Sequence, residues 1–438
     1  MKRVFAGLLA LVMCLSLCAC GGKVDLPPVP TAETVVVPAE TASPAETETP
    51  APVETEAPAP EHAEANGRVL VSVEKTEQQA FDPQFGETLI LSFSYETPIV
   101  INEENPDAAD KVNEFIGLLN EAYITGEDYG EGAGIGYNNM LTYAEENYGM
   151  QLEMNLEYPT FELTAARHIA IPRNDGRVLT LLFNDNSYTG GAHGSYSTRG
   201  YSFDMATGEK LSLASLSADE AALRDFLTQE MVQQAREDAY IHDQMEGFVE
   251  EDALEETLAA LLRSGSWYLD YEGMEIFSDL YEISSYAAGM VSFRIPNEKL
   301  LGHVDERFLA VPASSGGELR AIPAEAMEDG SMEIVDMVKV YDEGTTVYLV
   351  SDGPVQDLRV SSVDYFDYNG SFNESAVHWS CSGLENAAVQ LVTVIPDGMP
   401  NLKISWRGAS GEQSVFLTQS GEDGSLILMP GDSIEAVG

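Results

Sequence analysis

The stretch from residue 180 to 204 constrains the fold of this chain more than any other. Two strand-like runs, residues 178–183 and 196–203, flank a turn with the sequence Thr-Gly-Gly-Ala-His-Gly at 189–194. Paired glycines adopt positive φ angles at little steric cost, so the chain can reverse direction sharply there. The turn is surrounded by aromatic and imidazole side chains: Tyr188, His193, Tyr196 and Tyr201. The sequence therefore predicts two strands joined by a tight turn that carries an aromatic group.

The residues before this turn predict more strands and one clear helix. Residues 68–74 and 88–95 alternate between apolar and polar side chains as strands do. A helix is expected from Pro106, because apolar residues then recur at helical spacing. Further strands are predicted at 151–158, 161–171 and 176–183. One helix among so many strands favours an antiparallel sheet with the helix on one face.

The rest of the chain divides into a mixed part and a β part. Ser217 and Glu220 are spaced like a capping box at the start of a helix, and a second helix is expected at 251–263. Three strands follow, at 267–270, 273–277 and 290–295. From residue 332 onward the pattern is one of short strands separated by turn residues, including Asn369-Gly370, a favoured hairpin turn. A calcium loop at this turn would lack the acidic residue that its twelfth position needs.

We therefore predict an α+β fold class with three folded parts. Residues 67–204 and 205–310 each form a small α+β subdomain, in which helices pack on an antiparallel sheet. A connector at 311–330 leads to an all-β, sandwich-like domain at 331–438.

The first 66 residues predict export and anchoring. Residues 1–19 have the charged and apolar regions of a signal peptide, and they end in Leu-Cys-Ala before Cys20. This pattern resembles a bacterial lipobox, in which the last cysteine receives lipid. Residues 20–66 are rich in Pro, Thr and Glu and lack the apolar content needed to fold. We expect a disordered linker that holds the folded part away from the extracytoplasmic face of a bacterial membrane.

Charge and cysteine usage exclude several classes of function. The formal net charge is −51, with 73 acidic against 22 basic residues, which argues against a nucleic-acid partner. Removal of the signal peptide and lipidation of Cys20 leave only Cys381, so no internal disulfide is expected. We interpret Cys381 as a small buried side chain. No cofactor is predicted, and no two of the six histidines have a metal-ligand spacing: His62, His168, His193, His242, His303 and His378.

Several separated motifs resemble one extracytoplasmic module. They are the run from Tyr188 to His193, Tyr-Ser-Phe-Asp at 201–204, Trp-Tyr-Leu at 267–269, the run from Tyr281 to Gly289, and Phe-Arg-Ile-Pro at 293–296. The module is found in the lysozyme-sensing ectodomain of RsiV-type anti-sigma factors and in the N-terminal region of PdaC-type peptidoglycan deacetylases. By this resemblance, Tyr281 and Tyr286 belong to the surface that engages lysozyme. The paired zinc-binding histidines of the deacetylases are absent here.

These observations lead to a hypothesis of non-catalytic binding. The module is expected to bind peptidoglycan or a cationic wall-active protein such as lysozyme, with Tyr188, His193, Tyr281 and Tyr286 as candidate contacts. His193 has an alternative structural role, in which it locks the glycine turn by bonding to the backbone. Two other functions stay open: a wall-directed hydrolase using unidentified acidic residues, and a structural surface spacer.

The lipidation hypothesis gives a first prediction. Each CH₂ of an acyl chain contributes about 0.8 kcal/mol to membrane binding, so two or more chains hold a protein firmly. Changing Cys20→Ala should release the protein from the membrane fraction or leave it unprocessed. Metabolic labelling with palmitate tests this directly, and label retained on the variant would contradict the assignment.

Overall fold

The computed structural model describes residues 67–84, 86–128, 130, 134–154, 162–310, 317–327, 332–365, 372–395, 400–408, 411–419 and 426–430. The predicted signal peptide, Cys20 and the linker lie outside these ranges, as does the Asn369-Gly370 turn. The described residues all belong to one compact unit. None of the helices in the described ranges is long and apolar enough to cross a membrane.

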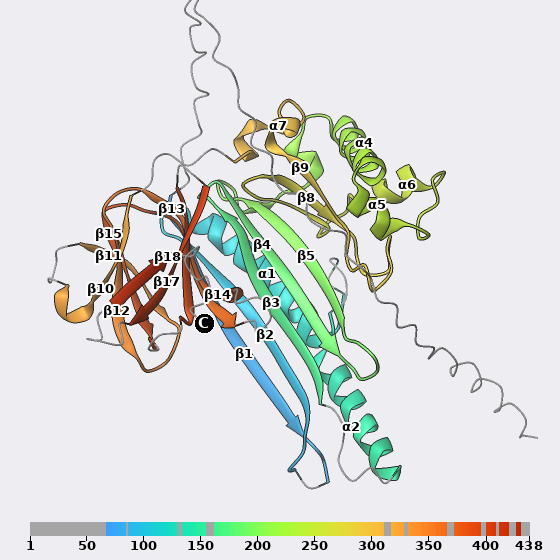
Figure 1. Cartoon of the computed structure of the whole chain (residues 1–438), viewed down its shortest axis with the longest axis horizontal. Coiled ribbons are helices and arrows are strands. Elements are labelled where there is room, and N and C mark those ends of the chain that lie inside the picture. Colours follow the sequence, from blue (N-terminus) through green and yellow to red (C-terminus); the bar gives the residue numbers. More distant parts are fainter. Residues whose placement is uncertain are drawn as a thin grey trace, which may run out of the picture. The chain divides into compact units, whose positions relative to one another are not determined.

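One large sheet dominates the structure (Figure 1). Its eleven strands run in the order β18-β17-β16-β13-β14-β1-β2-β3-β4-β5-β6. The six strands from the first part of the chain are β1 (Val69–Phe81), β2 (Leu89–Asn102), β3 (Leu163–Asn174), β4 (Val178–Tyr188), β5 (Ser195–Asp204) and β6 (Glu209–Lys210). The predicted strand pair around the glycine turn is β4 and β5, which are antiparallel over ten residue pairs.

Two helices connect β2 to β3, and the first of them is the helix predicted from Pro106. They are α1 (Pro106–Thr125) and α2 (Tyr137–Glu153). Because the chain returns through these helices, β2 and β3 pair in parallel, an exception in a mainly antiparallel sheet. The strand predicted from residue 151 is wrong at its start, since residues 151–153 continue α2. A short apolar run does not by itself distinguish a strand from a helix end.

Helix α1 lies along one face of the sheet, as Figure 1 shows. Its apolar stripe includes Val112 and Ile116, which pack against Val71, Val100 and other residues of one buried cluster. The Asn113 amide both donates to and accepts from the backbone of Val100, at 2.8 Å each. Burial of the stripe and this paired hydrogen bond fix the helix on the sheet.

The next part of the chain is a helical layer on a small sheet. The helices are α3 (Leu213–Leu216), α4 (Glu220–Glu237), α5 (Ala239–Met245), α6 (Leu254–Ala260), α7 (Asn297–Leu300) and the 3₁₀ turn η1 (Glu306–Phe308). Strands β7 (Trp267–Leu269), β8 (Gly273–Phe277) and β9 (Ser292–Pro296) form the antiparallel sheet. The predicted cap at Ser217 is wrong: Asp219 caps α4 by accepting from the Ala222 amide at 3.0 Å.

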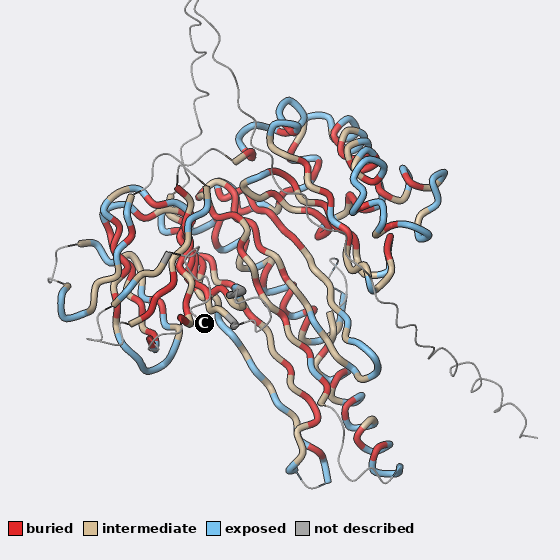
Figure 2. Tube along the Cα trace, viewed as in Figure 1, coloured by how far each residue is buried: buried red, intermediate tan, exposed pale blue. Residues whose placement is uncertain are grey.

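The remaining strands build a two-layer β structure. They are β10 (Leu319–Pro323), β11 (Glu333–Lys339), β12 (Thr345–Ser351), β13 (Val355–Tyr365), β14 (Phe372–Leu384), β15 (Ala387–Thr393), β16 (Leu402–Gly408), β17 (Gly411–Gln419) and β18 (Leu426–Pro430), with the 3₁₀ turn η2 (Ala324–Ala326) after β10. A four-stranded sheet, β10-β12-β15-β11, shares one buried core with β13, β14 and β16 of the large sheet. Figure 2 shows the buried positions that run along these strands. The predicted α+β class with a sandwich-like C-terminal part is confirmed.

The large sheet continues across the predicted connector, because β14 pairs with β1. Leu70 lies opposite Cys381, and the amide of Val69 donates to the hydroxyl of Ser382 at 2.9 Å. The buried amide of Asn174 donates to Ser380 at 3.1 Å. The sandwich is therefore an extension of the first sheet and shares its hydrogen-bond ladder.

A group of buried charges lies where β13 meets the earlier parts of the chain. Asp357 on β13 is fully buried, and its backbone has a positive φ of 47°. Burial raises the pKa of its carboxyl from 3.8 to about 7, although the Arg359 guanidinium and the Tyr271 hydroxyl act in the opposite direction. Tyr271 also lies under the guanidinium of Arg407, 3.9 Å from its ring centroid. This cluster ties the β7–β8 turn to the sandwich.

Asp357 should make the stability of the protein depend on pH. The folded protein keeps a proton that the unfolded chain releases above pH 3.8, so this residue lowers stability as the pH rises from about 4 to about 7. Asp357→Asn removes that contribution, and asparagine tolerates the positive φ. The difference in free energy of unfolding between variant and parent should grow by about 1.4 kcal/mol per pH unit in this window. Denaturant titrations at several pH values measure it.

The exposed Asp342→Asn substitution is the matched control, and it should follow the pH dependence of the parent protein. A constant difference between Asp357→Asn and the parent from pH 4 to pH 7 would contradict the raised pKa.

Candidate functional site

The glycine turn between β4 and β5 has the predicted backbone. Gly190 and Gly191 both have a φ of 94°, a backbone conformation that residues other than glycine rarely adopt. The Tyr188 hydroxyl donates to the carbonyl of Gly191 at 3.1 Å, and Nδ1 of His193 lies 2.9 Å from the carbonyl oxygen of Gly194. The predicted structural role of His193, bonding to the backbone of the turn, is therefore present.

The turn meets a second loop that is far away in sequence. The ring of His193 stacks on Tyr286 with 3.7 Å between centroids and 21° between planes. The Tyr286 hydroxyl donates to the carbonyl of Gly194 at 2.9 Å, so it fixes the turn from the other side. Tyr281 and Tyr196 lie 5.8 and 6.3 Å from the Tyr286 ring. We call His193, Tyr196, Tyr281 and Tyr286 the aromatic cluster.

Ion pairs hold the loop that carries Tyr281 and Tyr286. This loop, residues 278–291, connects β8 to β9. Arg263 forms two bonds to Glu282 at 2.7 and 2.8 Å and a third to Asp279 at 3.1 Å. Arg199 on β5 reaches the same Asp279 at 2.7 Å. Fork-shaped guanidinium groups that bind two carboxylates at once fix geometry more firmly than single ion pairs do.

Tyr281 is both exposed and strained. Its φ is 63°, an unusual value for a tyrosine, and 56 % of its surface is open to solvent. A residue in such a conformation costs on the order of 1–3 kcal/mol and persists where its surroundings impose it. Partly buried hydrogen bonds supply part of that constraint: Ser284 donates to the carbonyl of Gly289, and Gln244 of α5 donates to the carbonyl of Ala288 at 2.9 Å.

The structure therefore brings three of the four predicted ligand contacts into one surface. His193, Tyr281 and Tyr286 lie together, whereas Tyr188 supports the turn from within. Tyr201, also singled out by the sequence, is buried and packs edge-on against Phe115. Cys20 lies outside the described residues.

Sequence reasoning missed the supporting charges. The ion pairs join parts of the chain up to 80 positions apart, and no local sequence pattern predicts such pairs. They involve Arg199, Arg263, Asp279 and Glu282. One local signal existed: the Asp279 amide donates to Glu282 at 2.8 Å, three residues later, as in a capping box.

The aromatic cluster is suited to binding rather than to holding a metal. Stacking faces and hydroxyl groups are available at the surface, while the nearby carboxylates are engaged with arginines. The described part of the chain contains no group of three or more side chains that could ligate a metal ion. Cys381, the one cysteine in the part of the chain that the structure describes, is buried, and burial raises the pKa of its thiol to about 12.

Comparison with known protein families gives a match in this region. Residues 214–298 match the family model described as "Protein of unknown function (DUF3298)". The matched segment contains α4, α5, α6, β7, β8, and the loop with Tyr281 and Tyr286. No curated protein matches the chain.

Two solved structures resemble part of the chain. One is a DUF3298-family protein from Bacteroides fragilis NCTC 9343, with 18 % identity and a TM-score of 0.39; the similarity covers 55 % of this chain and 96 % of that one. The other is a DUF3298-family protein from Pseudomonas aeruginosa PAO1, with 14 % identity and a TM-score of 0.35, covering 55 % of this chain and 97 % of that one.

The ion pairs of Arg263 should keep the 278–291 loop rigid. Changing Arg263→Gln removes three hydrogen bonds to carboxylates, and because these groups are about one-third exposed we expect a loss of about 1–2 kcal/mol in stability. Amide exchange at residues 279–289 should accelerate more than exchange in the large sheet.

Arg236→Gln is the matched control, because its ion pair with Glu251 is largely exposed. That change should cost less than about 0.5 kcal/mol and leave exchange in the loop unaltered. Equal effects of the two substitutions would show that the loop does not depend on Arg263.

Proposed function

We propose that this protein is a surface-anchored lipoprotein whose aromatic cluster binds a cationic wall-active protein such as lysozyme. The function is non-catalytic: the cluster captures its partner, and the lipid on Cys20 with the linker at 20–66 holds the folded part outside the membrane.

The observation that carries this proposal is the pre-formed surface around Tyr281. Tyrosines are common anchors of protein interfaces because they bury a large apolar face and keep one polar group. An anchor fixed before binding loses little conformational entropy when the complex forms. Here the stacked pair His193–Tyr286 and the Arg263 ion pairs hold Tyr281 at the surface.

Charge supports a cationic partner. The chain has a formal net charge of −51, and helix α5 beside the loop is preceded by Asp238 and followed by Glu246 and Glu250. An excess of negative charge attracts a basic protein from a distance and raises the association rate. The resemblance to the RsiV-type ectodomain points to the same partner, and the family match includes the loop that carries the two tyrosines.

Binding kinetics test the proposal. Replacing Tyr281 and Tyr286 with Ala should speed dissociation from lysozyme by about 30-fold or more, because loss of an interface tyrosine often costs 2 kcal/mol or more. The association rate should stay unchanged, since it depends on charge. Tyr281→Ala alone should give part of the effect without removing the bond from Tyr286 to Gly194. Surface plasmon resonance measures both rates.

Controls separate this surface from nonspecific charge attraction. Tyr143→Ala with Tyr341→Ala removes two tyrosines that are also exposed, and it should not change dissociation. Cytochrome c is a basic protein of unrelated shape and should bind more weakly than lysozyme. Equal binding of the two proteins, or complete loss of lysozyme binding at about 0.15 M salt, would refute the proposal. Retention on insoluble peptidoglycan without lysozyme binding would instead identify the wall polymer as the ligand.

A further inference from the structure

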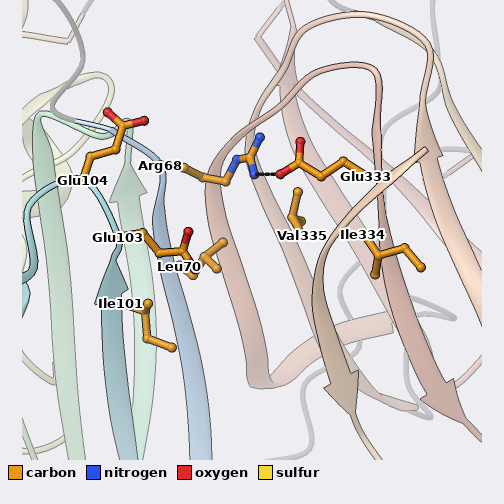
Figure 3. A pocket seen from close by; sticks show the side chains of 8 residues that line it. All are labelled: Arg68, Leu70, Ile101, Glu103, Glu104, Glu333, Ile334 and Val335. Atoms are coloured by element: carbon orange, nitrogen blue, oxygen red, sulfur yellow. Dashed lines mark hydrogen bonds and ion pairs between the residues drawn. The ribbon is translucent and has the colours of Figure 1, made fainter. Parts of the chain in front are cut away.

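A cavity of about 340 Å³ lies away from the aromatic cluster, between the end of the first hairpin and the edge of the sandwich (Figure 3). One wall comes from the start of β1 and the end of β2, and the other from β11. Cavities of this size hold small molecules. Its lining residues are Arg68, Leu70, Ile101, Glu103, Glu104, Glu333, Ile334 and Val335.

The lining combines an apolar surface with charged groups on two sides. Figure 3 shows Glu103 and Glu104 on the β2 wall and Glu333 on the β11 wall, with Arg68 and Leu70 between them. Ile101 lies beside Glu103, and Ile334 and Val335 lie on the β11 wall. Ile101 and Ile334 are each more than 40 % exposed, so this aliphatic surface is accessible. The lining therefore offers a ligand both apolar contacts and charged groups.

The charges of the lining determine which charge a ligand should carry. Three carboxylates and one guanidinium give the lining a formal charge of −2. Arg68 is paired with Glu333 at 3.1 Å, while the carboxylates of Glu103 and Glu104 have no partner among the residues that the structure describes. We propose that this cavity binds a linear aliphatic diamine or polyamine, with its ammonium groups against the glutamates and its methylene chain on Ile101 and Ile334.

The acidic linker that joins the fold beside this cavity is a poor occupant. Residue 67 directly precedes Arg68, but the preceding segment carries carboxylates and lacks lysine and arginine from residue 24 to 66. Like charges would repel it from Glu103 and Glu104. A dication matches the cavity in charge, and its methylene groups remove apolar surface from water.

Calorimetric titration of the purified full chain with 1,4-diaminobutane and spermidine tests the site. We expect one binding site with a Kd of about 0.1–1 mM for the six heavy atoms of the diamine, and tighter binding of the triamine. 1-Aminopentane has the same length with one ammonium replaced by methyl, and it should bind at least about tenfold more weakly. No saturable heat up to about 10 mM diamine, or equal binding of the monoamine, would overturn the proposal.

Two sets of variants locate the site. Glu103→Gln with Glu104→Gln should weaken diamine binding at least about tenfold. Glu145→Gln with Glu146→Gln, an adjacent exposed pair on α2, changes the net charge equally and should leave binding intact. Arg68→Ala should tighten binding several-fold, because it frees Glu333 from a competing cation. Misfolding does not explain a gain in affinity. Equal losses in both glutamate pairs, or weaker binding of Arg68→Ala, would show that the amine follows net charge rather than this cavity.

Discussion

The pairing of β1 with both β2 and β14 is the contact on which the rest of this structure depends. These pairings make β1 an interior strand of the eleven-stranded sheet. One neighbour is β2, which leads into α1 and α2, and the other is β14 of the sandwich. The joint is short, three residue pairs from Leu70 to Ser72, but it is partly buried and is reinforced by further hydrogen bonds. Asn174 donates to Ser380, and Arg359 on β13 donates to the carbonyl of Ile171 at 3.2 Å. Because buried polar groups are costly to leave unpaired, these bonds make the two halves of the sheet interdependent.

Much of the fold was predictable from local patterns. Alternation of apolar and polar residues predicted most of the strands, and the apolar stripe from Val112 to Ala122 predicted α1. The paired glycines predicted the β4–β5 turn. The continuation of the first sheet into the sandwich, through the pairing of β1 with β14, was not predictable. The residue pattern of a strand does not specify its partner in a distant part of the chain. The cap of α4 was misplaced because Ser217 and Asp219 both suit that role by residue type. In the structure Ser217 is the C-cap residue of α3, and Asp219 caps α4.

For the aromatic cluster, too, the local features were predictable and the long-range contacts were not. His193, Tyr281 and Tyr286 were selected from their motifs, and the structure places them in one cluster. Their support comes from Arg199 and Arg263, whose role is visible only after the β4–β5 turn and the 278–291 loop meet. The motif residues are thus the exposed part of a larger unit. Tyr281 keeps a strained backbone because charges and hydrogen bonds around it leave few alternatives.

The position of β1 also has a consequence for how the chain reaches its native state. Val69 bonds to Ser382, 313 positions later, so the pairing of an interior strand is complete only after a much later segment has been synthesised. Contacts this distant in sequence slow folding, and an unpaired strand is exposed to association with other chains in the meantime. Under the proposed secretion route, the first hairpin would emerge early with one ladder of hydrogen-bonding groups open. The many negative charges of the chain would then act as an electrostatic barrier between neighbouring nascent copies, keeping them apart until β14 arrives.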